Sequence, residues 1–137
     1  MAWYDTLGNG PRSLHLQGYQ LLDDRTCTLS LWIHDPEEGK TYVVGPRGGE
    51  AHAIYTSAMF PKNLLRSYSS SQANAGTLVL NRFDTRRRIV EGTFQFVARN
   101  NVQFTKDPAT PESIQVMNGR FRLGYDVARP SVGNPSE

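Results

Sequence analysis

The chain lacks most of the sequence features that indicate a particular enzymatic activity or a membrane-spanning segment. It contains one cysteine, Cys27, so an internal disulfide is excluded. No segment approaches the ~18 consecutive apolar residues of a membrane-spanning helix. Sequence motifs for a serine nucleophile elbow or a phosphate-binding glycine loop are absent. Without a nucleophile–base pair or paired carboxylates at recognisable spacing, we expect a protein that is not an enzyme.

Metal-ligand patterns are also missing from the sequence. His15, His34 and His52 do not pair at the i, i+2 or i, i+4 spacing of zinc ligands. Asp35 and Glu37-Glu38 follow His34 in a loop, but they lack the alternating ligands and central glycine of a calcium-binding loop. We interpret this loop as an acidic turn, and we predict neither a metal site nor a cofactor.

The charge of the chain is small and unevenly distributed. Its 137 residues carry a net charge of +2. The positive excess lies in the C-terminal half, in a series of arginines: Arg82, Arg86, Arg87, Arg88, Arg99, Arg120 and Arg122. A nucleic-acid-binding protein usually shows a broader basic surface with interleaved aromatic residues. We therefore expect no nucleic-acid partner.

Short alternating segments separated by glycine, proline and polar turns run along the chain. They predict strands at 13–19, 27–34, 40–44, 51–56, 77–83, 89–98 and 113–123. Convincing helices are absent, although 61–66 is compatible with a helical turn. The sequence thus predicts an all-β fold, an antiparallel β-sandwich or flattened barrel of about seven to eight strands, mostly meander-connected.

One domain is expected over residues 1–125, followed by a polar C-terminal tail over 126–137. Within the domain, 67–75 is rich in Ser, Asn and Gln and is interpreted as an exposed loop. Residues 99–111 form a second long connection. A chain of this length is able to bury a substantial core.

The strand at 89–98 shows the clearest alternation. Val90, Gly92, Phe94, Phe96 and Ala98 share one face, which we assign to the core. A glycine among bulky neighbours marks a bulge or a close approach by another group. We expect the two phenylalanines to pack against the face of 27–33 that carries its leucines and isoleucine.

The last strand contains a break in its alternation. Ile114 and Val116 share one phase, Phe121 and Leu123 the other, and Asn118-Gly119 lies between them. A β-bulge would restore the phase. A two-residue hairpin turn is the alternative, because Asn-Gly is a strong turn signal. The bulge is preferred, since a turn would leave two short strands.

Two groups of residues are candidates for a binding surface. Trp32 points away from the face of Cys27, Leu29, Leu31 and Ile33, so it faces the wetter side of its strand. It would suit a sugar or protein partner, unless a second buried layer covers it. On its own face, Cys27 is interpreted as a small buried hydrophobe.

The second candidate group is the run Arg86, Arg87 and Arg88, which lies at a hairpin tip. Guanidinium groups bind oxyanions. The neighbouring Asp84 and Glu91 favour an ordinary solvated turn, with contact to a sugar, lipid head group or protein as the next alternative.

Three segments in the C-terminal half carry a family resemblance. They are Gly76–Asp84, the "Val-x-Gly-Thr-Phe-x-Phe" strand Ile89–Ala98, and Ile114–Phe121 with its "Asn-Gly-x-Phe" ending. Together they resemble the C-terminal signature of a family of small bacterial envelope lipoproteins of unknown function. The match spans roughly 27–123 and is most specific over 76–121. No catalytic residues follow from the resemblance.

The resemblance implies an all-β domain at the cell envelope, outer-membrane-anchored or extracellular, with membrane contact only through a lipid anchor. This chain shows no leader and no lipidation cysteine at its start, so a cytoplasmic protein is the alternative if Met1 is the native start. The expected function is a non-enzymatic interaction or structural module that contacts protein or glycan. The alternative is a carrier of a small apolar ligand in a barrel-like cavity.

Overall fold

The computed structural model describes residues 2–5, 12–62 and 64–128, and all of its regular elements are strands. The predicted all-β class is confirmed. The strands are β1 (Ala2–Asp5), β2 (Ser13–Leu21), β3 (Arg25–His34), β4 (Thr41–Val44), β5 (Ala51–Met59), β6 (Leu64–Ser69), β7 (Gly76–Asp84), β8 (Ile89–Asn100), β9 (Ser113–Gly124) and β10 (Asp126–Ala128). In the described ranges no helix is long and apolar enough to cross a membrane.

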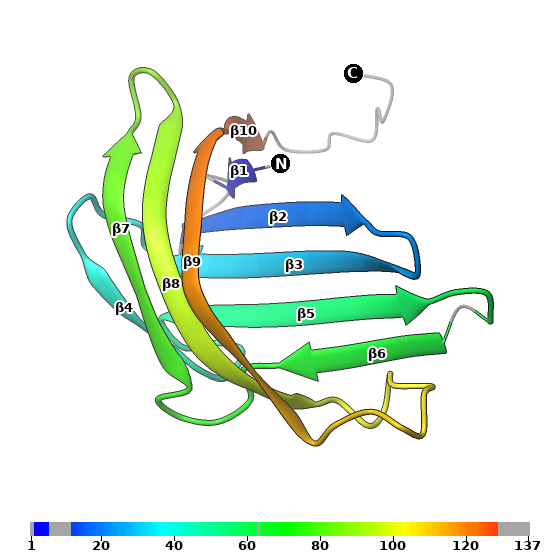
Figure 1. Ribbon diagram of the computed structural model, residues 1–137. Helices are drawn as coiled ribbons and strands as arrows, with labels where there is room; N and C mark the ends of the chain where they lie inside the picture. Colours follow the sequence, from blue (N-terminus) through cyan, green and yellow to red (C-terminus); the bar gives the residue numbers. More distant parts are fainter. Residues whose placement is uncertain (1, 6–11, 63, 129–137) are drawn as a thin grey trace, which may run out of the picture.

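The strands form one continuous sheet that folds over into two layers (Figure 1). Layer A contains β10-β1-β2-β3-β5-β6, and layer B contains β4-β7-β8-β9. All pairings are antiparallel except β1–β10 and β4–β5. Strands that follow one another in the sequence are also neighbours in the sheet at β1–β2, β2–β3, β5–β6, β7–β8 and β8–β9, as expected of a mostly meander-connected fold.

Among the described residues, strand pairing joins the two layers on one side. Strand β4 pairs with β5 through Val44 and Ala51, and β6 pairs with β8 through Tyr68–Asn100 and Ser69–Arg99. On the opposite side, β9 pairs only with β8 among the described strands. The hairpin ends of β2–β3 and β5–β6 extend past β9 in Figure 1. The sandwich is therefore open along β9.

The core between the layers follows the predicted alternation. In β8 the residues from Val90 to Ala98 alternate between buried and more exposed positions, and Phe94 and Phe96 are buried. Layer A contributes Leu31 and Ile33 to the same hydrophobic cluster, as expected. Leu29 packs at its edge and is half-buried.

The break in the last strand is a bulge, which confirms the preferred alternative. Strand β9 is continuous, and its register with β8 shifts so that Phe94 faces Gly119 while Phe96 faces Val116. Asn118 has a positive φ of 56°, a conformation that asparagine tolerates better than most residues. The bulge returns Phe121 to the inner face.

Two predictions about irregular segments are wrong. The suggested helical turn at 61–66 and the first part of the 67–75 loop are occupied by β6, which pairs with β5 from Met59–Leu64 to Ile54–Ser69. Pairing with a long neighbouring strand outweighs the weak β propensity of serine. Residues 71–74 are exposed, as expected of a loop.

The strands β1, β6 and β10 are additional to the seven expected ranges. Residues 126–128, predicted as the start of a tail, form β10 and pair with β1 in parallel. Residues 129–137 lie outside the described part of the chain.

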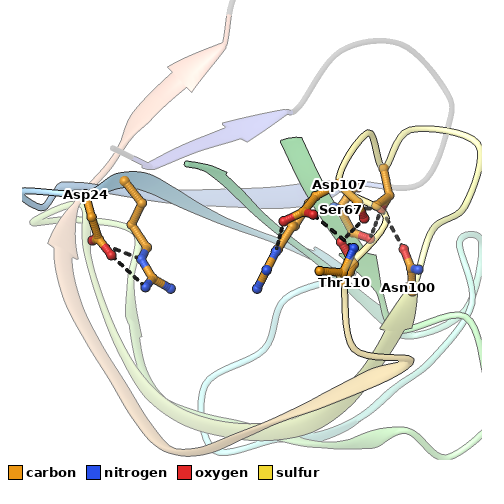
Figure 2. A network of polar contacts seen from close by, with 9 residues as sticks. Asp24, Ser67, Asn100, Asp107 and Thr110 are labelled. Carbon is orange, nitrogen blue, oxygen red and sulfur yellow. Dashed lines mark hydrogen bonds and ion pairs between the residues drawn. The ribbon is translucent and has the colours of Figure 1, made fainter. Parts of the chain in front are cut away.

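Polar contacts hold the long β8–β9 connection against β6 (Figure 2). The Arg66 Nε donates to Asp107 Oδ2 at 2.7 Å, and this pair is mostly shielded from solvent. The hydroxyl of Thr105 donates to Asn100 Oδ1 at 2.6 Å and accepts from the backbone N–H of Ser67 at 3.0 Å. The connection is thus fixed to layer A at several points.

Candidate binding groove

The open side of the sandwich contains a groove of about 400 Å³ between layer A and strands β8 and β9. This volume lies within the ~300–1,000 Å³ that small-molecule sites usually have. The groove is lined by six apolar side chains from both layers: Leu16, Leu29, Leu31, Phe94, Phe121 and Leu123. A groove lined in this way favours the binding of an apolar group.

Two strand edges border the groove without a partner among the described strands. One is the edge of β9, and the other is the edge of β2 over 17–21, since the described part of β1 pairs with β2 over residues 13–16. Gly18 lies at this edge, and a Cβ atom placed on it would have no neighbour within 4 Å. Tyr19 is 69% exposed beside it. The groove beside Gly18 therefore has room for a ligand without displacement of any core side chain.

Two arginines of β9, Arg120 and Arg122, border the groove, but they alternate with Phe121 and Leu123, so their side chains point to the outer face of layer B. Arg122 Nε lies 2.8 Å from Glu91 Oε1, and that carboxylate is also 3.9 Å from Arg82 Nη1. Arg120 is exposed and faces Thr93 across the strand pair. Among the described residues Arg120 makes no ion pair, and its side chain shares the outer face of layer B with Thr93.

A second hollow, of about 380 Å³, lies on the outer face of layer B. It is lined mainly by outward side chains of β7 and β8, among them Thr77, Thr93 and Gln95. Small-molecule sites are mostly apolar with few polar groups. The groove between the layers fits that description better than this outer hollow.

Trp32 lies on the outer face of layer A, away from the groove. Its ring stacks on His15 with centroids 4.3 Å apart and lies 5.8 Å from the ring of His52. The Trp32 side chain is half-buried. Burial lowers the pKa of His15 below 6.5, because the charged imidazolium loses hydration. The tryptophan is therefore part of a row of three rings.

Arg86, Arg87 and Arg88 form the exposed turn between β7 and β8. Asp84 Oδ1 accepts hydrogen bonds from the backbone N–H groups of Arg86 (3.0 Å) and Arg87 (2.9 Å). These contacts lower the pKa of Asp84, with the bond from Arg87 as the largest cause. The turn is on layer B, so the fold does not combine it with Trp32 into one surface.

Sequence reasoning missed a buried contact between His52 and Ser70. The Ser70 hydroxyl accepts from the N–H of Ala53 at 2.8 Å and lies 2.9 Å from the carbonyl of Gly45. It is also 3.3 Å from His52 Nδ1, which itself lies 2.9 Å from that carbonyl. Ser70 is fully buried, so these groups join β4, β5 and the end of β6 rather than meet a substrate. His52 and Ser70 lie 18 residues apart in the sequence, so no local sequence motif indicated their contact.

Cys27 lies on the predicted inner face but is half-buried, not buried as expected. The hydroxyl of Tyr55 donates to its sulfur at 3.2 Å. Burial, followed by this bond, raises the pKa of Tyr55 to about 12. The inner face is open at this end of β3, which explains the partial exposure.

The acidic loop after β3 is held by its own polar contacts. The Tyr42 hydroxyl accepts from the N–H of Glu37 at 2.7 Å and donates to the carbonyl of Asp35 at 3.0 Å. Glu38 accepts from the N–H of Phe83 at 3.0 Å. In the part of the chain that the structure describes, three or more His, Cys, Asp or Glu side chains nowhere gather in a way that would hold a metal ion.

Over the residues that the structure describes, the protein is a half-open β-sandwich of ten strands with an apolar groove between its layers. No protein-family model matches the chain, and searches of curated proteins and of solved structures find no significant match. The functional assignment therefore depends on the geometry of the groove.

Proposed function

We propose that this protein is a non-enzymatic binding module that holds a small molecule with an apolar chain in the groove between its layers. The observation that carries the proposal is the groove itself, with apolar side chains from both layers and open space above Gly18. Of the two functions expected from the sequence, the ligand carrier has this direct structural support.

The chemistry of the lining determines the expected affinity pattern. Each methylene group that leaves water for an apolar site contributes ~0.8 kcal/mol, or about fourfold in affinity. A groove with an apolar floor should therefore bind longer chains more tightly, until the chain exceeds the groove. A flat polar surface would show no such dependence.

Titration calorimetry with hexanol, octanol and decanol tests the proposal. We expect saturable binding that tightens with chain length. Native mass spectrometry of the freshly purified protein adds a second readout, because a carrier often retains its cargo. Absence of binding for all three alcohols, or affinities independent of chain length, would refute the assignment.

A blocking variant locates the site. Gly18→Leu places a side chain in the groove, where the added Cβ has open space. We expect it to abolish alkanol binding and leave the melting temperature nearly unchanged. Thr41→Leu, at an exposed position of β4, is the matched control and should bind normally. Equal binding by both variants would place the ligand elsewhere.

The half-buried ring of Trp32 supports a second candidate, an interaction module that contacts a protein or glycan through the outer face of layer A. Its stacking on His15 fixes the ring orientation before any partner binds. Iodide quenching of tryptophan fluorescence, compared between the wild type and Trp32→Phe, measures access to the ring. Complete shielding of the Trp32 signal would reject this candidate.

An envelope location remains part of the proposal, and its support is the resemblance of 76–121 to envelope lipoproteins. The first codons of the native gene test it, since a signal peptide ending in a lipidation cysteine would establish the anchor.

A further inference from the structure

We infer that the ligand of the groove carries an uncharged carbonyl group, and that the hydroxyls of Ser57 and Tyr68 bind this group. The inference rests on the proposed function and adds the polar end of the ligand to it. A further hollow, of about 350 Å³, lies between layer A and the first half of β9. We call it the inner hollow, and it is lined by Tyr55, Ser57, Arg66 and Tyr68 of layer A and by Ile114 and Val116 of β9.

The inner hollow adjoins the groove along β9. This strand runs across layer A from the level of β2 to that of β6 (Figure 1). Leu29 lines the groove, and Tyr55, its direct partner across the β3–β5 pair, lines the inner hollow. On β9, Phe121 belongs to the groove and Val116 to the inner hollow. A ligand that lies beside β9 therefore contacts both.

Two buried hydroxyl groups line the inner hollow without a hydrogen-bond partner among the described residues. Ser57 is 4% exposed and Tyr68 is 2% exposed. Ser57 pairs with Arg66, so Tyr68, two residues further on, is its diagonal neighbour on the inner face. A buried hydroxyl without a partner costs free energy. A ligand group that hydrogen-bonds to it would remove that cost.

The neighbouring charges favour an uncharged acceptor. Arg25 and Arg66 line the inner hollow, and guanidinium nitrogens only donate hydrogen bonds. Each charge is already balanced, since Arg25 Nη2 lies 2.9 Å from Asp24 Oδ2 and Arg66 Nε lies 2.7 Å from Asp107 Oδ2. A carbonyl oxygen accepts two hydrogen bonds without adding a charge. A ketone, ester or amide carbonyl therefore suits the inner hollow better than a carboxylate or an ammonium group.

Titration calorimetry with 2-octanone, 2-nonanone and 2-decanone separates the two parts of the site. Chain length reports on the groove, at about fourfold in affinity per methylene group. The hydroxyls contribute a factor that is the same for all three ketones. Ser57→Ala and Tyr68→Phe each remove one hydroxyl. Each should weaken every ketone by about two- to tenfold and leave the chain-length dependence unchanged.

Ser30→Ala is the matched control, because Ser30 is a buried serine on the opposite face of layer A. It should bind the ketones like the wild type. An equal loss of affinity in Ser30→Ala and Ser57→Ala would reject a specific role for Ser57. Without ligand, Ser57→Ala should keep or raise the melting temperature, because it removes an unpartnered hydroxyl. A lower melting temperature would give Ser57 a structural role and overturn the inference.

The remaining outcomes separate this inference from the proposed function. If both hydroxyl variants bind the ketones like the wild type, or if the alkanols bind and the ketones do not, the carbonyl inference fails and the groove assignment stands. Tighter binding of decanoate than of 2-decanone would also overturn it, since the head group would then be charged. If neither alkanols nor ketones bind, the proposed function itself is refuted.

Discussion

The ring of Phe94 lies against Gly119, its direct partner across the β8–β9 pair, in the space that a Cβ atom on Gly119 would occupy. Two residues further along each strand, the aromatic residue is on β9 and the glycine is on β8. Phe121 faces Gly92, and its ring takes the space of the missing side chain there. The two aromatic–glycine pairs let large rings lie flat on a strand pair that also contains a bulge.

Adding a methyl group to either glycine should therefore destabilise the protein. Gly119→Ala forces the Phe94 ring out of place, and overpacking of this kind typically costs about 1–3 kcal/mol. Urea denaturation measures the loss. Gly18→Ala in β2 is the control, because its Cβ would meet nothing within 4 Å, and it should be neutral or slightly stabilising. Equal stability of the two variants would contradict the close packing.

Phe94→Ala should remove a large part of the stability. The side chain is 8% exposed and belongs to the central hydrophobic cluster, so truncation should cost about 3–5 kcal/mol. That is a large share of the ~5–15 kcal/mol typical of a whole domain. Val97→Ala on the outer face of the same strand, where the side chain is 41% exposed, should change little. A melting temperature unaffected by Phe94→Ala would reject the assigned core face.

Stability should fall as the pH drops below 6.5, in part because of His15. Burial lowers the pKa of this imidazole in the folded state, so the unfolded chain binds a proton first. The contribution is complete above the unfolded pKa of 6.5 and is lost as the pH falls through the folded pKa. Urea midpoints at about pH 7.5 and about pH 5 measure the slope. His15→Gln should reduce that slope, and an identical slope in the variant would exclude the residue as a cause.

Removing the positive charge of the β7–β8 turn should leave stability nearly unchanged. Replacing Arg86 and Arg87 with Ser, and Arg88 with Asn because its φ is +56°, should shift the unfolding free energy by less than about 0.5 kcal/mol. The side chains are exposed, and Asp84 holds the turn through backbone groups. Binding of wild-type protein to nucleic acid should be weak and lost at physiological salt. Sub-micromolar, sequence-selective binding would instead support a nucleic-acid role.

Much of the fold could be predicted because alternation reports directly on burial. The strict pattern in β8 identified its inner face, and the phase change around Asn118 identified the bulge. Both features are local and depend on a period of two. By contrast, β6 is stabilised by pairing with β5 and by the contacts of Ser70, which lies 17 residues from Ala53. Its own sequence resembles a loop.

The groove could not be predicted for a related reason. The residues that line it were recognised as core positions, Leu29, Leu31, Phe94 and Phe121 among them. Whether the layers close over such residues depends on strand pairing at the far edge. The alternation within a segment indicates which of its faces is buried, but not which strand pairs with its edge.

The unpaired edge of β9 also has a consequence for the behaviour of the protein at high concentration. An open strand edge is a template for edge-to-edge polymerisation, and natural proteins protect such edges with charges and bulges. Strand β9 has both, since the bulge at Asn118 interrupts its hydrogen-bonding edge and Arg120 and Arg122 follow directly. These charges would then keep one copy of the protein from pairing edge to edge with another. Substituting both arginines together should therefore lower the solubility of the protein.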